Sequence, residues 1–228
     1  MTNFTYEIVR SPKRRKLTII VERDRRVVVR APANASDDDI ARVLNAKRNW
    51  ILEKLRHPQK YRNHRHPPGK EVVNGESAPY LGRDYRIQII DTPSGDVEFD
   101  HQFYVPPQQQ LKRREVLRDW YIMQAKEEIL RRVAQHAQNL GVEFRVARIV
   151  DSRYRWGSCT VKDNVNFNWR LIKAPTFVID YVIVHELAHL LETNHTERFW
   201  SIIRAHSPFM EKARTWLKEH GQVLEEEL

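Results

Sequence analysis

The sequence predicts an α+β fold, and three observations support that prediction. Short runs of β-branched residues recur in the first hundred positions, which is typical of strands. Residues 111–140 repeat apolar side chains at helical spacing and end before Gly141, a residue suited to the C-terminal cap of a helix. Nearer the C-terminus, apolar residues 181–184 lead into His185-Glu186-Leu187-Ala188-His189, which predicts a second, apolar helix.

The first elements are expected between residues 5 and 58. Strands are predicted at residues 5–9, 17–21 and 27–30. Ser36 is predicted to cap a helix, because the three aspartates that follow it suit the positive end of a helix dipole. This helix is expected to continue to His57-Pro58, where the proline ends it.

A linker and a second group of strands are expected next. Residues 60–69 are polar, basic and end in two prolines and a glycine, so they are predicted to form a linker or a long loop. His64 and His66 have no acidic or cysteine neighbour in that stretch, and we interpret them as loop residues and not as a second metal site. Residues 80–90 predict a hairpin, and residues 97–105 predict further strand.

The long helix and the segments after it complete the predicted fold. The apolar positions expected to form the core stripe of residues 111–140 are Val116, Trp120, Met123, Leu130, Ala134 and Ala137. Strands are expected at residues 145–152 and 164–169, and closing helices after residue 197 with an interruption at Ser207-Pro208. The chain is therefore expected to divide into a β-rich segment with one helix (1–105) and a second domain (106–228).

The motif at residues 185–189 has the spacing of a metal site. Helical residues four positions apart lie on one face, so His185 and His189 can both bind Zn²⁺ through neutral ring nitrogens. Glu186 follows the first histidine and can take a proton from the water on the metal, as a general base. The motif therefore predicts one zinc ion with an open position for water.

A third ligand is expected at His195. An unbroken helix would turn His195 away from the other two histidines. Asn194 favours a break, however, and Asn194-His195-Thr196-Glu197 is typical of a capping box that opens a new helix. Glu192 is the competing candidate, because it lies three residues after His189 on the same helical face. His195 is preferred, and the alternative for Glu192 is a solvated helix residue.

Four polar residues near the motif are candidates for substrate contact. Alternation in residues 164–169 places Asn166 and Asn168 on one face of a predicted edge strand. That face, or its backbone, either lines the cleft and pairs an extended peptide or simply points to solvent. Arg155 and Arg170 flank this region and are candidates to stabilise an oxyanion or a phosphate, although an arginine beside a tryptophan is equally a stacking or salt-bridge residue.

Several short motifs in the C-terminal half resemble one known family. They are Arg155-Trp156-Gly157-Ser158-Cys159-Thr160, Asn166-Phe167-Asn168-Trp169-Arg170-Leu171, Val184-His185-Glu186-Leu187-Ala188-His189, Asn194-His195 and Phe199-Trp200. Across about residues 146–216 the chain resembles the YgjP-like zinc-dependent metallopeptidases and hydrolases, which are related to the SprT-like and WLM metalloproteases. The resemblance implies that His185, His189 and His195 are the metal ligands and that Glu186 is catalytic. It also fits a zincin-like core, in which a long helix supports the metal helix and an edge strand lies over the cleft.

Composition favours a cytoplasmic enzyme. No window approaches the ~18 apolar residues that would span a membrane, and residues 1–15 lack the apolar centre of a signal peptide. Cys159 is the only cysteine, so an intrachain disulfide is excluded and no disulfide-linked partner is expected. We interpret this thiol as an ordinary buried cysteine and not as a nucleophile or ligand.

The function expected from these features is metal-dependent hydrolysis. A metallopeptidase that cleaves peptide bonds with a zinc-activated water is the first expectation. The alternatives are a pyrophosphatase-type hydrolase of nucleotides or other small phosphorylated substrates, a SprT-like protease of nucleic-acid-associated proteins, and a purely structural zinc site. The formal charge of +9 predicts non-specific attraction to polyanions, because no recognisable nucleic-acid-reading motif is present.

Overall fold

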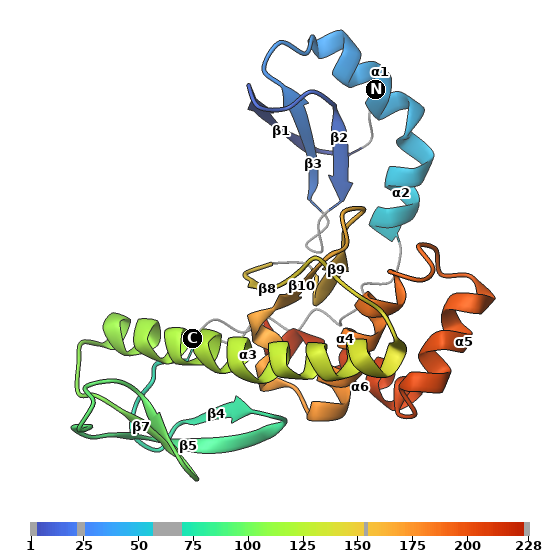
Figure 1. The fold of residues 1–228 in the computed structure, drawn as a ribbon. Coiled ribbons are helices and arrows are strands. Elements are labelled where there is room, and N and C mark those ends of the chain that lie inside the picture. The colour runs from blue at the N-terminus through green and yellow to red at the C-terminus, as the bar shows by residue number, and fades with distance from the viewer. Residues whose placement is uncertain (1–3, 22–25, 57–69, 153–154, 226–228) are drawn as a thin grey trace. The chain divides into compact units, whose positions relative to one another are not determined.

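The structure is a computed structural model that describes residues 4–21, 26–56, 70–152 and 155–225. The chain forms two compact units, Met1–Asn63 and His64–Leu228 (Figure 1). The predicted linker at residues 60–69, with His64 and His66, lies outside the described residues. No helix among the described residues combines the length and apolar character that crossing a membrane would need.

The first unit is a small sheet covered by two short helices. Its strands β1 (Tyr6–Ser11), β2 (Thr18–Val21) and β3 (Val27–Pro32) lie in the order β1-β3-β2, with β1 parallel and β2 antiparallel to β3. All three were predicted. The core joins the central strand β3 to the helices and includes Val27, Val29, Ala31, Ile40, Leu44 and Ile51.

The helical part of this unit differs from the single helix that was predicted. Ser36 caps α1 (Asp37–Ala46) as expected, since its side chain accepts a hydrogen bond from the backbone N–H of Asp39. The helix stops at Lys47, and α2 (Arg48–Arg56) follows directly. Asn45 and Asn49 flank this break, and asparagine side chains compete with helical hydrogen bonding of the backbone.

The second unit begins with a four-stranded sheet that packs on the long helix. The strands β4 (Ser77–Tyr80), β5 (Arg83–Ile89), β6 (Glu98–Phe99) and β7 (Phe103–Val105) lie in the order β4-β5-β7-β6. Phe103 lies 5.0 Å from Trp120 between ring centroids, so these strands share their core with residues beyond 106. The compact units therefore separate at residue 63, whereas the sequence suggested a division at residue 105.

The long helix α3 (Gln110–Leu140) matches its predicted bounds within one residue. It ends as predicted at Gly141, which adopts the left-handed conformation (φ 67°) that favours glycine. The predicted core stripe was right at Trp120 and Ala137, which are buried, and wrong at Met123 and Ala134, which are exposed. The residues that are buried along α3 are Leu117, Trp120, Tyr121, Ala125, Ile129, Val133 and Ala137.

A three-stranded sheet beside the helices differs from the prediction in its order. The strands β8 (Val146–Val150), β9 (Gly157–Cys159) and β10 (Asn164–Asn168) lie in the order β8-β10-β9. Residues 164–169 were predicted to form an edge strand, but β10 is central, parallel to β8 and antiparallel to β9. The edge strands are β8 and β9, and the three residues of β9 are too few to give an alternating pattern.

The C-terminal part of the unit is helical and completes the predicted α+β fold. A 3₁₀ turn η1 (Trp169–Lys173) leads into α4 (Thr176–Ala188), and α5 (Glu197–His206) and α6 (Met210–Leu224) close the unit (Figure 1). The break between α5 and α6 lies at Ser207, as predicted. Apolar residues cover every side of α4, which is typical of a helix that is buried in the core.

Candidate metal centre

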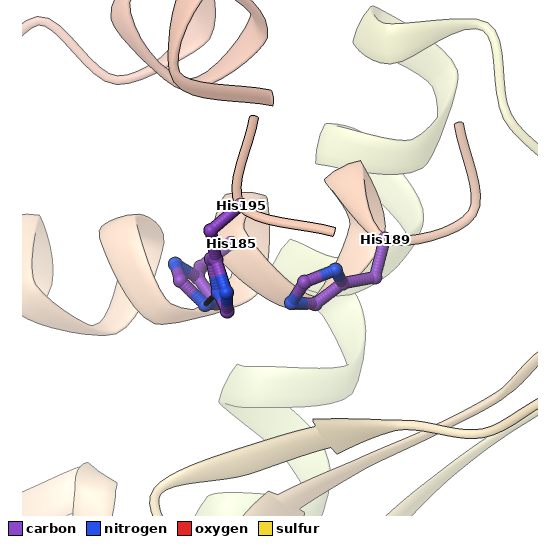
Figure 2. Close-up of side chains that lie close together, drawn as sticks. All are labelled: His185, His189 and His195. Atoms are coloured by element: carbon purple, nitrogen blue, oxygen red, sulfur yellow. Dashed lines mark hydrogen bonds between the residues drawn. The ribbon is translucent and has the colours of Figure 1, made fainter. Parts of the chain in front are cut away.

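The three histidines predicted to share a metal lie together in the structure. His185 belongs to the last turn of α4, His189 caps that helix, and His195 lies in the loop before α5. Their rings converge on one point (Figure 2), and one nitrogen from each lies within 4.8 Å of the others. The closest pair is Nε2 of His185 and Nε2 of His195, 3.1 Å apart.

The chain brings His195 back by ending α4 early. The backbone N–H of Glu192 donates to the carbonyl of Ala188, and no further helical turn follows before α5. Thr196, whose side chain accepts from the N–H of Phe199, caps α5. The capping box predicted from Asn194 was therefore displaced by two residues, because the threonine hydroxyl takes the capping position. His195 consequently lies in the loop immediately before the cap.

A backbone hydrogen bond determines which nitrogen of His189 points into the cluster. Nδ1 of His189 lies 3.1 Å from the backbone carbonyl of Glu192, and a carbonyl can only accept. The neutral ring therefore carries its proton on Nδ1 and keeps a lone pair on Nε2 for a metal. Glu192, the competing ligand in the sequence prediction, thus contributes its carbonyl, and its carboxylate accepts from the N–H of Asn194 at 3.4 Å.

The environment favours neutral imidazoles. Burial, followed by the neighbouring His189 and His195, lowers the pKa of His185 to about 4. Burial also lowers the pKa of His189, although the Glu192 carbonyl opposes that effect. Neutral rings are the form that binds a cation. Two ligands of a tetrahedral zinc with bonds of about 2.0–2.1 Å would lie roughly 3.4 Å apart, and the 3.1 Å between the nitrogens of His185 and His195 is close to that spacing.

Two aromatic rings of α5 hold the imidazoles in place. Phe199 stacks on His189, with ring centroids 4.6 Å apart and an interplanar angle of 30°. Trp200 stacks on His195 in the same way, at 5.7 Å and 27°. Both residues belong to the sequence motifs that resemble the family, and neither was predicted to contact the histidines. Their adjacency explains how one short helix orients two of the three rings.

The carboxyl group of Glu186 lies in a buried position beside β9. Its side chain is buried, and this burial raises the pKa of Glu186 to about 7, against the lowering effects of a backbone hydrogen bond from Cys159 and of Arg155. Gly157 leaves room for it, since a Cβ there would lie 2.5 Å from Cγ of Glu186 and 2.7 Å from Oε1. The need for glycine was not predicted, although its place in the Trp156-Gly157-Ser158 motif was the available signal.

Only one of the four substrate-contact candidates is placed close to Glu186. Arg155 is exposed and near enough to lower the pKa of that carboxyl group. Asn166 donates to Oγ of Ser158 at 3.2 Å. Arg170 forms an ion pair with Asp151, and its guanidinium carbon lies 4.5 Å from the centroid of the Trp169 ring. These contacts match the salt-bridge and stacking role that was the alternative to oxyanion binding. A substrate role for these three residues stays a prediction.

Asn168 has a different set of partners from those expected. It is 2% exposed, and its amide donates to the carbonyls of Ser152 and Arg155 at 2.6 and 3.2 Å. Its side-chain oxygen accepts from the backbone N–H of Arg170 at 3.0 Å. The side chain therefore holds the segment that leads into β9, and it is not exposed for contact with a substrate.

Cys159 remains an ordinary thiol. Burial, followed by the charges of Glu186 and Asp163, raises the pKa of this half-buried cysteine. A raised pKa disfavours the thiolate, which is the form that acts as nucleophile or metal ligand.

Three converging histidines beside a buried glutamate are typical of metal-dependent hydrolases. The chain belongs to the YgjP-like family, whose metallopeptidase domain matches residues 15–220. Among solved structures it is similar to the metallopeptidase zymogen jannalysin of Methanocaldococcus jannaschii (15% identity, TM-score 0.36) and to the zymogen abylysin of Pyrococcus abyssi (19%, 0.34). Each similarity covers 40% of this chain and 93% of the other. The comparison with curated proteins gave no significant match.

Proposed function

We propose that this protein is a zinc peptidase whose metal is held by His185, His189 and His195. The observation that carries the proposal is the convergence of three imidazole nitrogens within 4.8 Å, in an environment that keeps the buried rings neutral. When bound there, zinc supplies a Lewis acid that polarises the scissile carbonyl and makes water acidic enough to react near neutral pH.

Glu186 is the proton carrier in this proposal. Its carboxylate takes the proton from the attacking water and delivers it to the amine that leaves the scissile bond. Burial raises its pKa to about 7, and a general base works best with a pKa near the operating pH. The backbone N–H of Cys159 and the charge of Arg155 hold the carboxylate at the edge of β9.

The edge of β9 offers a place for an extended peptide. Asn168 donates its backbone N–H to the carbonyl of Trp156, and Thr160 donates its N–H to the carbonyl of Asn164. Because antiparallel strands alternate, the backbone groups of Gly157 and the carbonyl of Cys159 point away from β10, and the Cys159 N–H on that side donates to Glu186. No other described strand pairs with that edge. A substrate strand can therefore add to β9 beside Glu186, the role first suggested for residues 164–169.

Hydrolysis of small phosphorylated substrates is the second candidate. Two arginines favour it, since the charge of Arg155 acts on Glu186 and that of Arg214 acts on His185. Phosphate-transfer sites commonly use arginine to neutralise the charge that develops during reaction. The same residues would then position water and an anionic substrate.

One experiment separates these candidates. The zinc-loaded protein and Glu186→Gln are each incubated with an unfolded protein, a peptide mixture and nucleoside triphosphates, and products are identified by mass spectrometry. Peptide products from the wild type and none from Glu186→Gln support the peptidase. Hydrolysis of triphosphates alone would replace it with the second candidate. Activity retained in Glu186→Gln, or no product from any substrate, would contradict the proposed mechanism.

A further inference from the structure

An arginine lies beside the histidine cluster, and the peptidase mechanism proposed above gives it no role. Arg214 belongs to α6, and its guanidinium carbon lies 5.2 Å from the centroid of the Trp200 ring. The same tryptophan stacks on His195 and lies 6.1 Å from His185 between ring centroids. One indole therefore contacts both the cation and two of the candidate metal ligands.

The charge of Arg214 acts on two side chains of α4. It lowers the pKa of His185, after the larger effects of burial and the other two histidines. It also acts to lower the pKa of Tyr181, which burial raises overall. Tyr181 lies one turn before His185, with ring centroids 5.9 Å apart. Because charge interactions weaken with distance, these effects agree with the ring contacts in placing the guanidinium close to the cluster.

The guanidinium is oriented but still accessible. Glu211, one turn earlier on α6, accepts from Nη1 of Arg214 at 3.1 and 3.4 Å. Among the hydrogen bonds of the described residues, Nη1 is the atom of Arg214 that donates, and a guanidinium has five N–H donors. The side chain is 48% exposed. Donors therefore remain for a ligand that arrives from solvent.

We propose that Arg214 binds an anionic group of the substrate beside the histidine cluster. The ligand chemistry is that of an oxyanion, either a carboxylate or a phosphate, because a guanidinium fork can bind two of its oxygens at once. In a peptide the group is the C-terminal carboxylate or an acidic side chain. In a phosphorylated substrate it is a phosphate. The inference rests on the proposed function for the place of the reacting bond.

Arg204 provides a matched control. It lies on the neighbouring helix α5, pairs with Glu197 and is 50% exposed, so its charge and accessibility resemble those of Arg214. Its side chain also donates to Oγ of Ser201 at 3.3 Å. Among the described residues, no ion pair, side-chain hydrogen bond or cation–π contact links its guanidinium to Trp200 or to the histidines.

The first test measures binding without turnover. Inorganic phosphate and succinate are titrated calorimetrically into the zinc-loaded wild type, Arg214→Gln, Arg214→Lys and Arg204→Gln. All four proteins keep the three histidines, so a difference in anion affinity between them is due to the arginine and not to the metal. We expect at least one anion to bind the wild type and to bind Arg214→Gln at least tenfold more weakly, with Arg214→Lys between them and Arg204→Gln unchanged.

The relative affinities distinguish the two sources of the anion. Tighter binding of succinate indicates a carboxylate site, and tighter binding of phosphate indicates a phosphate site. No binding to the wild type, or equal binding to Arg214→Gln, would overturn the inference. These outcomes do not depend on Glu186, so they are separate from failure of the proposed mechanism, which shows as activity retained in Glu186→Gln.

A second test uses turnover. Substrates are compared in pairs that differ only by the anionic group, for example a peptide and its C-terminal amide. Arg214→Gln is expected to raise KM for the anionic member at least tenfold, to leave kcat within about twofold, and to leave the neutral member unaffected. An equal effect on both members would assign Arg214 to the general structure of the site and contradict a role in recognition.

Discussion

At the scale of single residues, Gly157 is as necessary to the site as a charged side chain. A Cβ at this position would lie 2.5–2.8 Å from three atoms of the Glu186 side chain, which is far closer than atoms in contact approach. We predict that Gly157→Ala displaces the carboxylate and lowers kcat at least tenfold, while zinc binding changes little. The measurement is kcat alongside zinc content.

The neighbouring residue is the control for this substitution. Ser158 is the next residue in β9, and its hydroxyl accepts a hydrogen bond from Asn166 of the neighbouring strand β10. Ser158→Ala is expected to keep most of the activity. Equal activity of Gly157→Ala and the wild type would show that the close approach to Glu186 has no part in catalysis.

The buried carboxyl of Glu186 should also cost stability in the metal-free protein. Burial raises its pKa from 4.5 to about 7, so this group favours the folded state below pH 4.5 and loses that contribution as pH rises through 7. Glu186→Gln is therefore predicted to be more stable than the wild type at pH 8 by up to roughly 3 kcal/mol. Urea unfolding with a chelator, repeated at pH 4.5 and 8, measures it. A difference that does not grow with pH would contradict the assignment.

At this scale, the chemistry of the site was more predictable from the sequence than its local geometry was. Helical spacing identified His185 and His189, and the break after them identified His195, because these relations depend on chain positions alone. The cap at Thr196 and the carbonyl of Glu192 could not be predicted, since they depend on where α4 ends. The close approach of Gly157 joins residues 29 positions apart, and no local pattern encodes it.

At the scale of elements, a polar cluster connects the supporting helix to the metal helix. Asp180 of α4 accepts a hydrogen bond from Arg132 at 2.9 Å, and its Oδ1 lies 3.1 Å from Nε2 of His136. Arg132 and His136 both belong to α3. Glu128 pairs in turn with Arg132. Burial alone would raise the pKa of Asp180, but the hydrogen bonds from His136 and Arg132 outweigh it and lower the pKa.

This cluster predicts a pH-dependent loss of stability in Asp180→Asn. Because the pKa of Asp180 is lower in the folded than in the unfolded protein, its charge stabilises the folded state at pH values above the unfolded pKa near 3.8. That stabilisation is lost as the pH falls through the folded-state pKa. The substitution should destabilise the protein by about 1–2 kcal/mol at pH 7, since the pair is partly exposed and screened, and by less below pH 4. Denaturant unfolding at pH 7 and 3.5 measures both. An effect independent of pH would contradict the role of the charge.

Helices and strands were predictable from the sequence where their pattern of apolar residues extended over many positions. The bounds of α3 followed from thirty residues of periodicity and a terminal glycine. Its buried face followed only in part, because apolar residues such as Met123 and Leu130 lie beside the stripe that packs. The side that is covered is decided by η1, α4 and the strands that pack against α3. The edge strand β9 was missed because three residues carry no period.

At the scale of the whole molecule, the net positive charge comes from the first compact unit. Residues 1–63 contain 16 Lys and Arg against 7 Asp and Glu, whereas residues 64–228 contain 23 of each. The formal charge of +9 therefore belongs to the first unit, and the unit with the histidines is neutral overall. This distribution favours recruitment to a polyanion by the first unit over a general attraction of substrates to the site.

The charge distribution predicts where nucleic acid would bind. We expect a labelled single-stranded oligonucleotide to bind in a salt-dependent manner, because each phosphate contact releases counterions. Replacing the exposed Lys13, Arg15 and Lys16 with Gln should weaken binding and reduce the salt slope. Fluorescence anisotropy at several salt concentrations measures both quantities.

A matched variant makes this prediction specific. Lys112, Lys126 and Lys218 are also exposed, and their replacement with Gln removes the same charge from the second unit. That variant is expected to bind like the wild type. An equal loss of oligonucleotide affinity in the two triple variants would show that net charge alone governs binding. No binding of the oligonucleotide to the wild type would contradict recruitment by the first unit.

The division of the chain was the least predictable feature at this scale. Strands at residues 77–105 resemble those at residues 6–32 in composition, and the sequence therefore grouped them. Packing separates them, because Ile87, Phe103 and Val105 belong to the same core as Trp120 and Tyr121 of α3. Long-range packing of this kind leaves no signal in a single sequence.

The central claim is the three-histidine metal site, and zinc stoichiometry tests it most directly. Purified wild type, Glu186→Gln, Glu192→Ala and His195→Ala are loaded with zinc, dialysed and measured by elemental analysis. We predict about one zinc in the first three proteins, because Glu192→Ala keeps the backbone carbonyl that orients His189. His195→Ala should lose most of its metal. A wild type without stoichiometric zinc, or a His195→Ala variant that retains it fully, would contradict the account.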